Sequence, residues 1–213
     1  MNLKISYKDY QFVSSKQNTP YLMISLHGRG DTFFGMRKIK HKLKLDNMNY
    51  LFLNAPDEWI TDTGFLGKSW YERPPHHNMG LKKSLNLLSQ LIIELNSQGI
   101  NQIYLNGFSQ GSVLGLEYIL RYPNDVKGFF GMSGFIFREQ ELSQLDSNNP
   151  TNVFLTHGLL DEVLNAQDYK NSLQKISNKF ISFTYEDWNK LHLIDDRDIR
   201  LMKSHINQVF DIS

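Results

Sequence analysis

The chain has 213 residues, a length that fits one domain of ordinary size with a sizeable hydrophobic core. Its 23 Lys and Arg residues nearly balance its 22 Asp and Glu residues, which argues against a strongly basic surface for nucleic acid or anionic membrane. The sequence has no cysteine, so disulfides, thiolate metal sites and a thiol nucleophile are excluded.

The first residues, MNLKISYKDYQF, alternate apolar and polar types and lack the apolar centre of a signal peptide. No later apolar run reaches the roughly 18 residues that a membrane-spanning helix needs. We therefore expect a single cytoplasmic domain over residues 1–213, without nucleic acid as a partner and without stable membrane insertion. Whether it is a monomer or a homodimer stays open.

Apolar runs of strand length alternate with segments of helical period, which is typical of a mostly parallel sheet with helices on both faces. The predicted fold class is α/β. A weak strand or hairpin is expected at residues 3–13. Six strands should follow it, at residues 21–26, 50–53, 102–105, 126–132, 152–156 and 180–185.

Four helices are expected between these strands or after the last one. Leucines recur at three- and four-residue steps from Leu81 to Leu95, which predicts an amphipathic helix that ends at Gly99. Pro123 should stop the second helix, and Asp195 or Asp196 should begin the last one. The predicted helices are residues 80–97, 110–121, 165–176 and 196–210.

A short motif predicts the nucleophile. Residues 107–111 read Gly-Phe-Ser-Gln-Gly, which is the G-x-S-x-G pattern of a nucleophile elbow between a strand and a helix. Such an elbow holds its serine in strained backbone geometry with the hydroxyl raised above the sheet. The predicted strand and helix flank this motif on the required sides, so Ser109 is the expected nucleophile of an α/β-hydrolase fold.

Acyl transfer also needs two backbone N–H groups directed at the developing oxyanion. One normally comes from the residue after the nucleophile, here Gln110, and the other from a loop after an earlier strand. The segment His27-Gly28-Arg29-Gly30-Asp31 is such a loop, and Arg29 is the expected donor. The alternative for this segment is a tight strand-to-helix turn that binds no ligand.

The acid and the base of a triad should follow the serine in the order Asp, then His. Asp161 and His192 satisfy this order, each after a predicted strand, with Glu162 and Asp187 as competing acids. No metal site is expected at the His76-His77 pair, because Pro74-Pro75 breaks any helix that would align it. The other histidines are expected to order loops, to pack or to lie at the surface: His27, His41, His157 and His205.

Several blocks of the chain occur in the order that one known family shows. They are Leu26-His27-Gly28-Arg29-Gly30-Asp31-Thr32, Asn54-Ala55-Pro56, Ser69-Trp70-Tyr71-Glu72, Gly107-Phe108-Ser109-Gln110-Gly111, and His157-Gly158 with Asp161. From about residue 21 to about residue 210 the chain thus resembles the phospholipase/carboxylesterase family of α/β-hydrolases, which includes the acyl-protein thioesterases. The resemblance implies a triad of Ser109, Asp161 and His192, oxyanion N–H groups from Arg29 and Gln110, and no cofactor.

The chain departs from this family's pattern at three places. Arg29 replaces a usual leucine, Glu72 replaces a usual aspartate, and Lys190-Leu191 replaces small residues before the histidine. A guanidinium cannot be left dry and unpaired without a large penalty. Arg29 therefore favours short or medium acyl groups, or acyl groups with a polar or anionic end, over palmitoyl-length chains.

The segment 59–71 is more apolar than a solvated loop and is expected to wall the acyl site, although it could instead cover a sheet edge. The expected substrate contacts are Phe65, Leu66, Trp70 and Phe108. The sequence predicts a serine hydrolase for small-molecule esters or acylated substrates, acting on short to medium acyl chains. The alternatives are a thioesterase or lysophospholipase for long acyl chains, a peptidase or amidase, and a non-catalytic binding protein with this fold.

Overall fold

The computed structural model describes residues 3–146 and 148–210 and is built on one central sheet. Seven strands lie in the order β1-β3-β2-β6-β7-β8-β9, and β1 is antiparallel to β3 whereas the other neighbours are parallel. The expected α/β fold is confirmed. The strands are β1 (Tyr10–Val13), β2 (Tyr21–Leu26), β3 (Asn49–Leu53), β6 (Gln102–Phe108), β7 (Gly128–Met132), β8 (Asn149–Gly158) and β9 (Phe180–Trp188).

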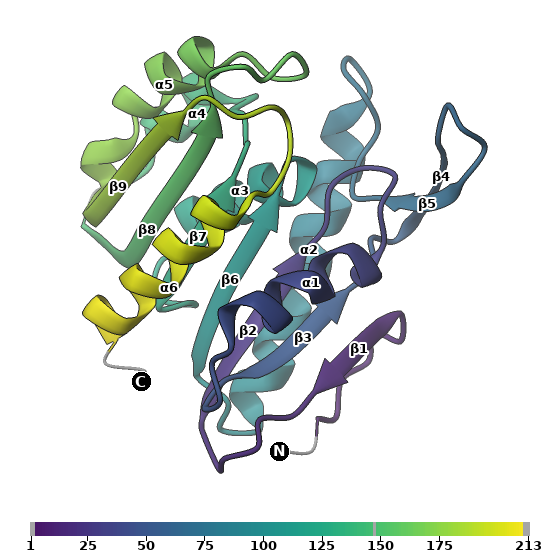
Figure 1. Ribbon diagram of the computed structural model, residues 1–213, viewed down its shortest axis with the longest axis vertical. Helices are drawn as coiled ribbons and strands as arrows, with labels where there is room; N and C mark the ends of the chain where they lie inside the picture. Colours follow the sequence, from purple (N-terminus) through teal and green to yellow (C-terminus); the bar gives the residue numbers. More distant parts are fainter. Residues whose placement is uncertain (1–2, 147, 211–213) are drawn as a thin grey trace.

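Helices cover both faces of the sheet, with α1 and α6 in front of it and α2 and α3 behind it in Figure 1. The helices are α1 (Phe33–Leu43), α2 (His77–Ser97), α3 (Gln110–Arg121), α4 (Glu139–Ser143), α5 (Ala166–Gln174) and α6 (Asp196–Phe210), with a 3₁₀ turn η1 (Ser177–Lys179). Among the described residues, no helix has both the length and the apolar character needed to cross a bilayer.

Two hydrophobic cores lie on the two faces, because successive side chains of a strand point to opposite sides. On β2, Leu22 and Ile24 pack with the apolar stripes of α2 and α3, whereas Met23 packs with those of α1 and α6. The same alternation on β3 sends Leu51 to the first core and Phe52 to the second. Both faces of these strands are buried, as is usual for a parallel sheet between helices.

The structure contains two helices that were not predicted from the sequence, α1 and α4, and it also differs from the expected elements in one hairpin and at the ends of strands. Residues 59–71 do not form a loop, because β4 (Asp57–Ile60) and β5 (Leu66–Ser69) pair as an antiparallel hairpin that projects from the main sheet in Figure 1. This hairpin was not predicted because its two strands are short and contain charged residues. The longer strands were predicted from their continuous apolar runs. β6, β8 and β9 extend two or three residues beyond their predicted ends, and only Tyr10–Val13 of residues 3–13 forms a strand.

Candidate active site

The elbow at Ser109 lies between β6 and α3. The Ser109 backbone has φ 51° and ψ −115°, a conformation that residues other than glycine rarely adopt. The Ser109 amide donates a hydrogen bond to the Met132 carbonyl (2.9 Å) on the neighbouring strand. A Cβ on Gly107 would lie 2.4 Å from the Gly111 carbonyl oxygen, and a Cβ on Gly111 would lie 2.2 Å from that of Leu26. The glycines thus permit the close backbone approach that holds the turn.

The three predicted triad side chains form one hydrogen-bonded chain. Ser109 Oγ lies 2.9 Å from His192 Nε2, and His192 Nδ1 lies 2.7 Å from Asp161 Oδ2. The other carboxylate oxygen, Oδ1, accepts hydrogen bonds from the amides of Val163 (2.9 Å) and Leu164 (2.8 Å). The parallel order of β6, β7, β8 and β9 places the loops that carry these residues at one edge of the sheet.

The environment of Asp161 keeps its carboxyl ionised at neutral pH. The side chain is fully buried, whereas the side chain of His192 is 16% exposed. Burial alone would raise the pKa of Asp161, but hydrogen bonds from the Leu164 amide and His192 outweigh it and hold the pKa below its usual value. An acceptor-only carboxylate requires Nδ1–H on His192, which leaves Nε2 free to take the Ser109 proton.

The competing acids lie outside the triad, whereas His157 supports the triad acid from its own loop. Asp187 Oδ2 forms an ion pair with Lys170 Nζ at 3.1 Å, and Glu162 is exposed. His157 Nε2 donates to the Leu164 carbonyl (2.9 Å) and also lies 3.3 Å from Asp161 Oδ2, and burial lowers the pKa of this histidine, so its ring is neutral at neutral pH. His157 therefore holds the loop that carries the acid, which is the loop-ordering role expected from the sequence.

Gln110 begins helix α3, and its backbone N–H is one of the first four helical amides, which have no partner within a helix. Its side chain is buried and joins the elbow to the segment after β5. The side-chain Oε1 accepts a hydrogen bond from the Trp70 amide (2.9 Å), and Nε2 donates to the Tyr71 carbonyl (2.6 Å). The sequence pattern indicated only the backbone role of Gln110 and not this bridge.

Arg29 lies in the loop between β2 and α1, and neighbouring contacts fix this loop against the hairpin. The Gly30 amide donates to the Lys68 carbonyl on β5 (2.8 Å). His27 Nε2 accepts a hydrogen bond from the Ala55 amide (3.0 Å), and burial lowers the pKa of His27, which keeps the ring neutral and able to accept. These two hydrogen bonds fix the loop that carries Arg29, whose backbone N–H is the expected oxyanion donor.

The structure places only one of the four expected substrate contacts beside Ser109. Phe108 lines a pocket there, with its ring 5.0 Å from the ring of His192. Trp70 is instead fully buried, and its Nε1 donates to the His27 carbonyl (2.9 Å), so the indole supports the oxyanion loop from behind. Phe65 and Leu66 are 55% and 54% exposed on the projecting hairpin and line neither pocket at Ser109.

Two pockets meet at Ser109. The larger, about 620 Å³, extends past Gln110 and is lined mainly by apolar side chains. The smaller, about 300 Å³, opens beside His192. Both pockets include Arg29 and Arg73 in their walls. The apolar residues of the larger pocket are Tyr71, Pro74, Val113, Phe135, Phe137, Val163 and Leu164.

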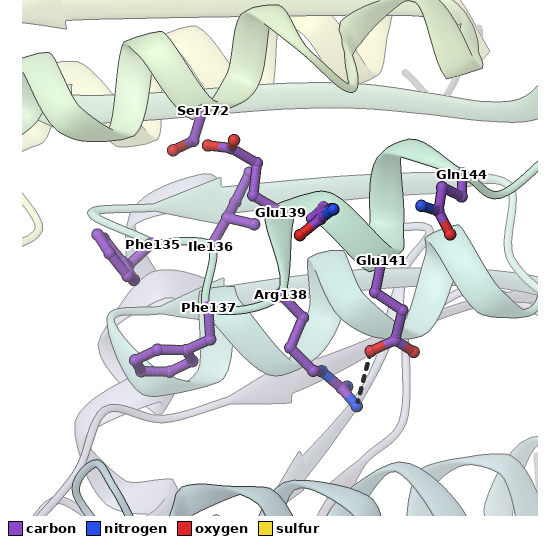
Figure 2. Close-up of a pocket in the computed structure, with 9 residues that line it drawn as sticks. Phe135, Ile136, Phe137, Arg138, Glu139, Glu141, Gln144 and Ser172 are labelled. Atoms are coloured by element: carbon purple, nitrogen blue, oxygen red, sulfur yellow. Dashed lines mark ion pairs between the residues drawn. The ribbon is translucent and has the colours of Figure 1, made fainter.

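A further hollow of about 730 Å³ lies on the other side of the segment 135–137 and is shown in Figure 2. Its lining includes Arg138, Glu139 and Glu141 but none of the triad residues. Figure 2 shows Arg138 directed toward Glu141, and Arg138 also pairs with the buried Glu117 of α3. These ion pairs fasten Arg138, the residue that follows Phe135 and Phe137 in the wall of the larger pocket. Ser109 lines that larger pocket, and no triad residue lines this hollow.

Lys190 fixes the loop of the candidate base in a way that the sequence pattern did not indicate. Its Nζ lies 2.7 Å from both carboxylate oxygens of Asp198, and the two residues are 5% and 1% exposed. Asp198 also accepts a hydrogen bond from the Thr156 hydroxyl (2.5 Å). The Lys190 carbonyl accepts from the Leu160 amide (3.1 Å), so this residue joins the loops of Asp161 and His192.

Comparison with known proteins assigns the chain to a family. The model of the phospholipase/carboxylesterase family matches residues 8–210. The chain belongs to this family. It is therefore a serine hydrolase with the α/β-hydrolase fold.

Named relatives of this hydrolase support the assignment. It is 32% identical to acyl-protein thioesterase 1 of Eremothecium gossypii over 161 residues, and this matched region covers 69% of this chain and 68% of the relative. It is 29% identical over 203 residues to lysophospholipase-like protein 1 of Mus musculus, covering 86% and 84% of the two chains. The crystal structure of SOBER1 from Arabidopsis thaliana shares the fold, with a TM-score of 0.77 at 21% identity over 88% of this chain and 98% of that one.

Proposed function

We propose that this hydrolase cleaves carboxylic esters or thioesters, with Ser109 as nucleophile, His192 as general base and Asp161 as the residue that orients the histidine. The observation that carries the proposal is the continuous hydrogen-bonded chain from the serine hydroxyl to a buried carboxylate, with heavy-atom distances of 2.9 and 2.7 Å. A nucleophile in contact with a base, and a base oriented by a third group, is the arrangement that covalent acyl transfer needs.

The reaction divides into two acyl transfers. Ser109 Oγ attacks the acyl carbonyl while its proton moves to His192 Nε2, and the backbone N–H groups of Arg29 and Gln110 stabilise the oxyanion. His192 then gives the proton to the leaving oxygen or sulfur, and the acyl group remains on Ser109. Water, deprotonated by His192, attacks this ester and releases the acid, which returns the serine to its starting state.

The position of His192 indicates which pocket takes each half of the substrate. The leaving group must contact the histidine that protonates it, so it belongs in the smaller pocket, which His192 lines. The acyl group then belongs in the larger pocket beyond Gln110. Arg29 and Arg73 in its wall are poor neighbours for a long alkyl chain, so we propose short to medium acyl groups as substrates.

A rate panel tests this function. 4-Nitrophenyl esters from acetyl to palmitoyl, a palmitoyl thioester and an anilide separate an esterase from a long-chain thioesterase and from an amidase. Ser109→Ala and His192→Ala should each lower ester hydrolysis by on the order of a thousandfold or more. Ser204→Ala, at an exposed position of α6, is the matched control.

A fluorophosphonate probe should label wild-type protein and not Ser109→Ala. Retention of more than roughly a tenth of the rate by either triad variant, or no labelling of folded protein, would overturn the proposal. Arg29→Leu should shift the optimum toward longer acyl groups, because its backbone amide remains while the guanidinium is lost. A wild-type enzyme fastest on the palmitoyl thioester would favour the alternative of a thioesterase or lysophospholipase for long acyl chains.

A further inference from the structure

We propose that Arg29 and Arg73 together form an anion-binding site beside Ser109 that selects acyl groups ending in a carboxylate. The inference rests on the ester-hydrolase function proposed above and names its substrate class.

The two guanidinium groups lie around one aromatic ring. Arg29 Cζ is 5.0 Å and Arg73 Cζ is 5.6 Å from the centroid of Trp59, and Arg29 Cζ is also 5.8 Å from the centroid of Tyr71. Both arginines line both pockets that meet at Ser109. Stacking on an aromatic face orients a planar guanidinium and leaves the N–H groups at its edge available to a ligand.

Neither guanidinium has a carboxylate partner in the part of the chain that the structure describes. Within residues 3–146 and 148–210, no Asp or Glu side chain forms an ion pair with Arg29 or Arg73; Asp62 lines the smaller pocket without reaching either. Arg29 Nη2 donates to the Tyr71 carbonyl (3.2 Å), which is a neutral acceptor, and Arg29 Nε is buried without a hydrogen-bond partner. By contrast, Arg121, Arg138 and Arg197 pair with glutamates.

The partly buried charge of Arg29 lies near the like charge of Arg73 and is unfavourable until an anion binds. Burial lowers the pKa of Arg29, and the nearby charge of Arg73 acts in the same direction. An arginine nevertheless keeps its proton at neutral pH, so the unfavourable charge remains. A carboxylate between the two groups would relieve their repulsion and accept charge-assisted, bidentate hydrogen bonds.

We assign the bound carboxylate to the acyl half of the substrate, not to the leaving group. The larger pocket is assigned to the acyl group because His192 lines the smaller one, and Arg29 and Arg73 lie in its wall together with Val113 and Phe137. A short dicarboxylic half-ester, such as a succinyl or glutaryl ester, would place its methylene groups on the apolar wall and its free carboxylate at the arginines.

Two esters of equal chain length test the site: the 4-nitrophenyl half-ester of glutaric acid, and 4-nitrophenyl pentanoate, which carries a methyl group in place of the carboxylate. After subtraction of the uncatalysed rates, kcat/KM for the glutaryl ester should be higher by about tenfold or more, and added salt should reduce the ratio. Arg73→Gln, at an exposed position, and Arg29→Gln should each bring the ratio toward one. Arg200→Gln, an exposed arginine on α6, should leave the ratio unchanged.

A second pair of esters places the anion on the leaving group: 4-acetoxybenzoate and 4-acetoxybenzamide. A preference for the anion confined to this pair would overturn the assignment to the acyl side. Hydrolysis of the pentanoyl ester by Ser109 without any preference for the glutaryl ester would overturn the inference and leave the proposed function intact. Absence of hydrolysis that depends on Ser109 for every ester would overturn both.

Discussion

The buried ion pair behind the histidine loop makes a quantitative prediction about stability. Lys190→Met keeps an apolar stem of similar length but leaves the Asp198 carboxylate, which is 1% exposed, without the cation that lies 2.7 Å from both of its oxygens. Removing one partner of a buried pair costs about 3–5 kcal/mol. Asp198 retains hydrogen bonds from the Thr156 hydroxyl (2.5 Å) and the Asp195 amide (2.9 Å). We therefore expect the lower end, about 3 kcal/mol.

For a chain of this length, each 1 kcal/mol lowers Tm by about 2–4 °C, so Lys190→Met should lower it by about 6–12 °C. The double variant Lys190→Met with Asp198→Asn removes both charges and should recover much of the loss, because no buried charge remains uncompensated. Lys82→Met, at an exposed position of α2, is the control and should stay within about 0.5 kcal/mol of wild type.

Urea unfolding at neutral pH, with calorimetry for Tm, measures these differences. A loss for Lys190→Met no larger than that for Lys82→Met would show that the pair contributes nothing net. A double variant no more stable than Lys190→Met would show that the loss comes from packing and not from the unpaired charge.

Three further predictions follow from the site. Asp161→Asn should lower kcat strongly but less than loss of the serine, whereas Asp187→Asn should be mild; reversed kcat values would assign the acid to the other loop. Gly111→Ala should destabilise the fold by about 1–3 kcal/mol and lower kcat, because its Cβ would lie 2.2 Å from a backbone oxygen. Urea unfolding and ester hydrolysis measure the two effects, and a variant as stable and as active as wild type would contradict this prediction. His27 and His157 have pKa values lowered by burial, so the unfolded chain binds protons near about pH 6.5 while the folded chain does not. This contribution to stability is present above that pH and is lost as the pH falls, so urea unfolding should show lower stability at about pH 5.5 than at about pH 7.5; equal values would refute it.

Much of the site is readable from local sequence because an elbow is a local structure. The motif around Ser109 needs glycines where two backbones touch, and its neighbours must form a strand and a helix, all within a short stretch of chain. Asp161 and His192 follow from chain order, since in a parallel sheet each lies after a strand whose carboxyl end reaches the same edge. Periodicity likewise predicts which side chains of the long helices face the sheet.

Other features depend on which segments meet, and hydrophobic periodicity does not report this. Trp70 reads as an apolar loop residue, but the hairpin of β4 and β5 turns its indole inward against the His27 carbonyl. The role of Lys190 requires Asp198 of α6 to be buried beside it, and the arginine pair requires a residue before α2 to reach the loop after β2. Such contacts join distant parts of the chain, and their free energies depend on burial and on partners that only the packed sheet brings within hydrogen-bond distance.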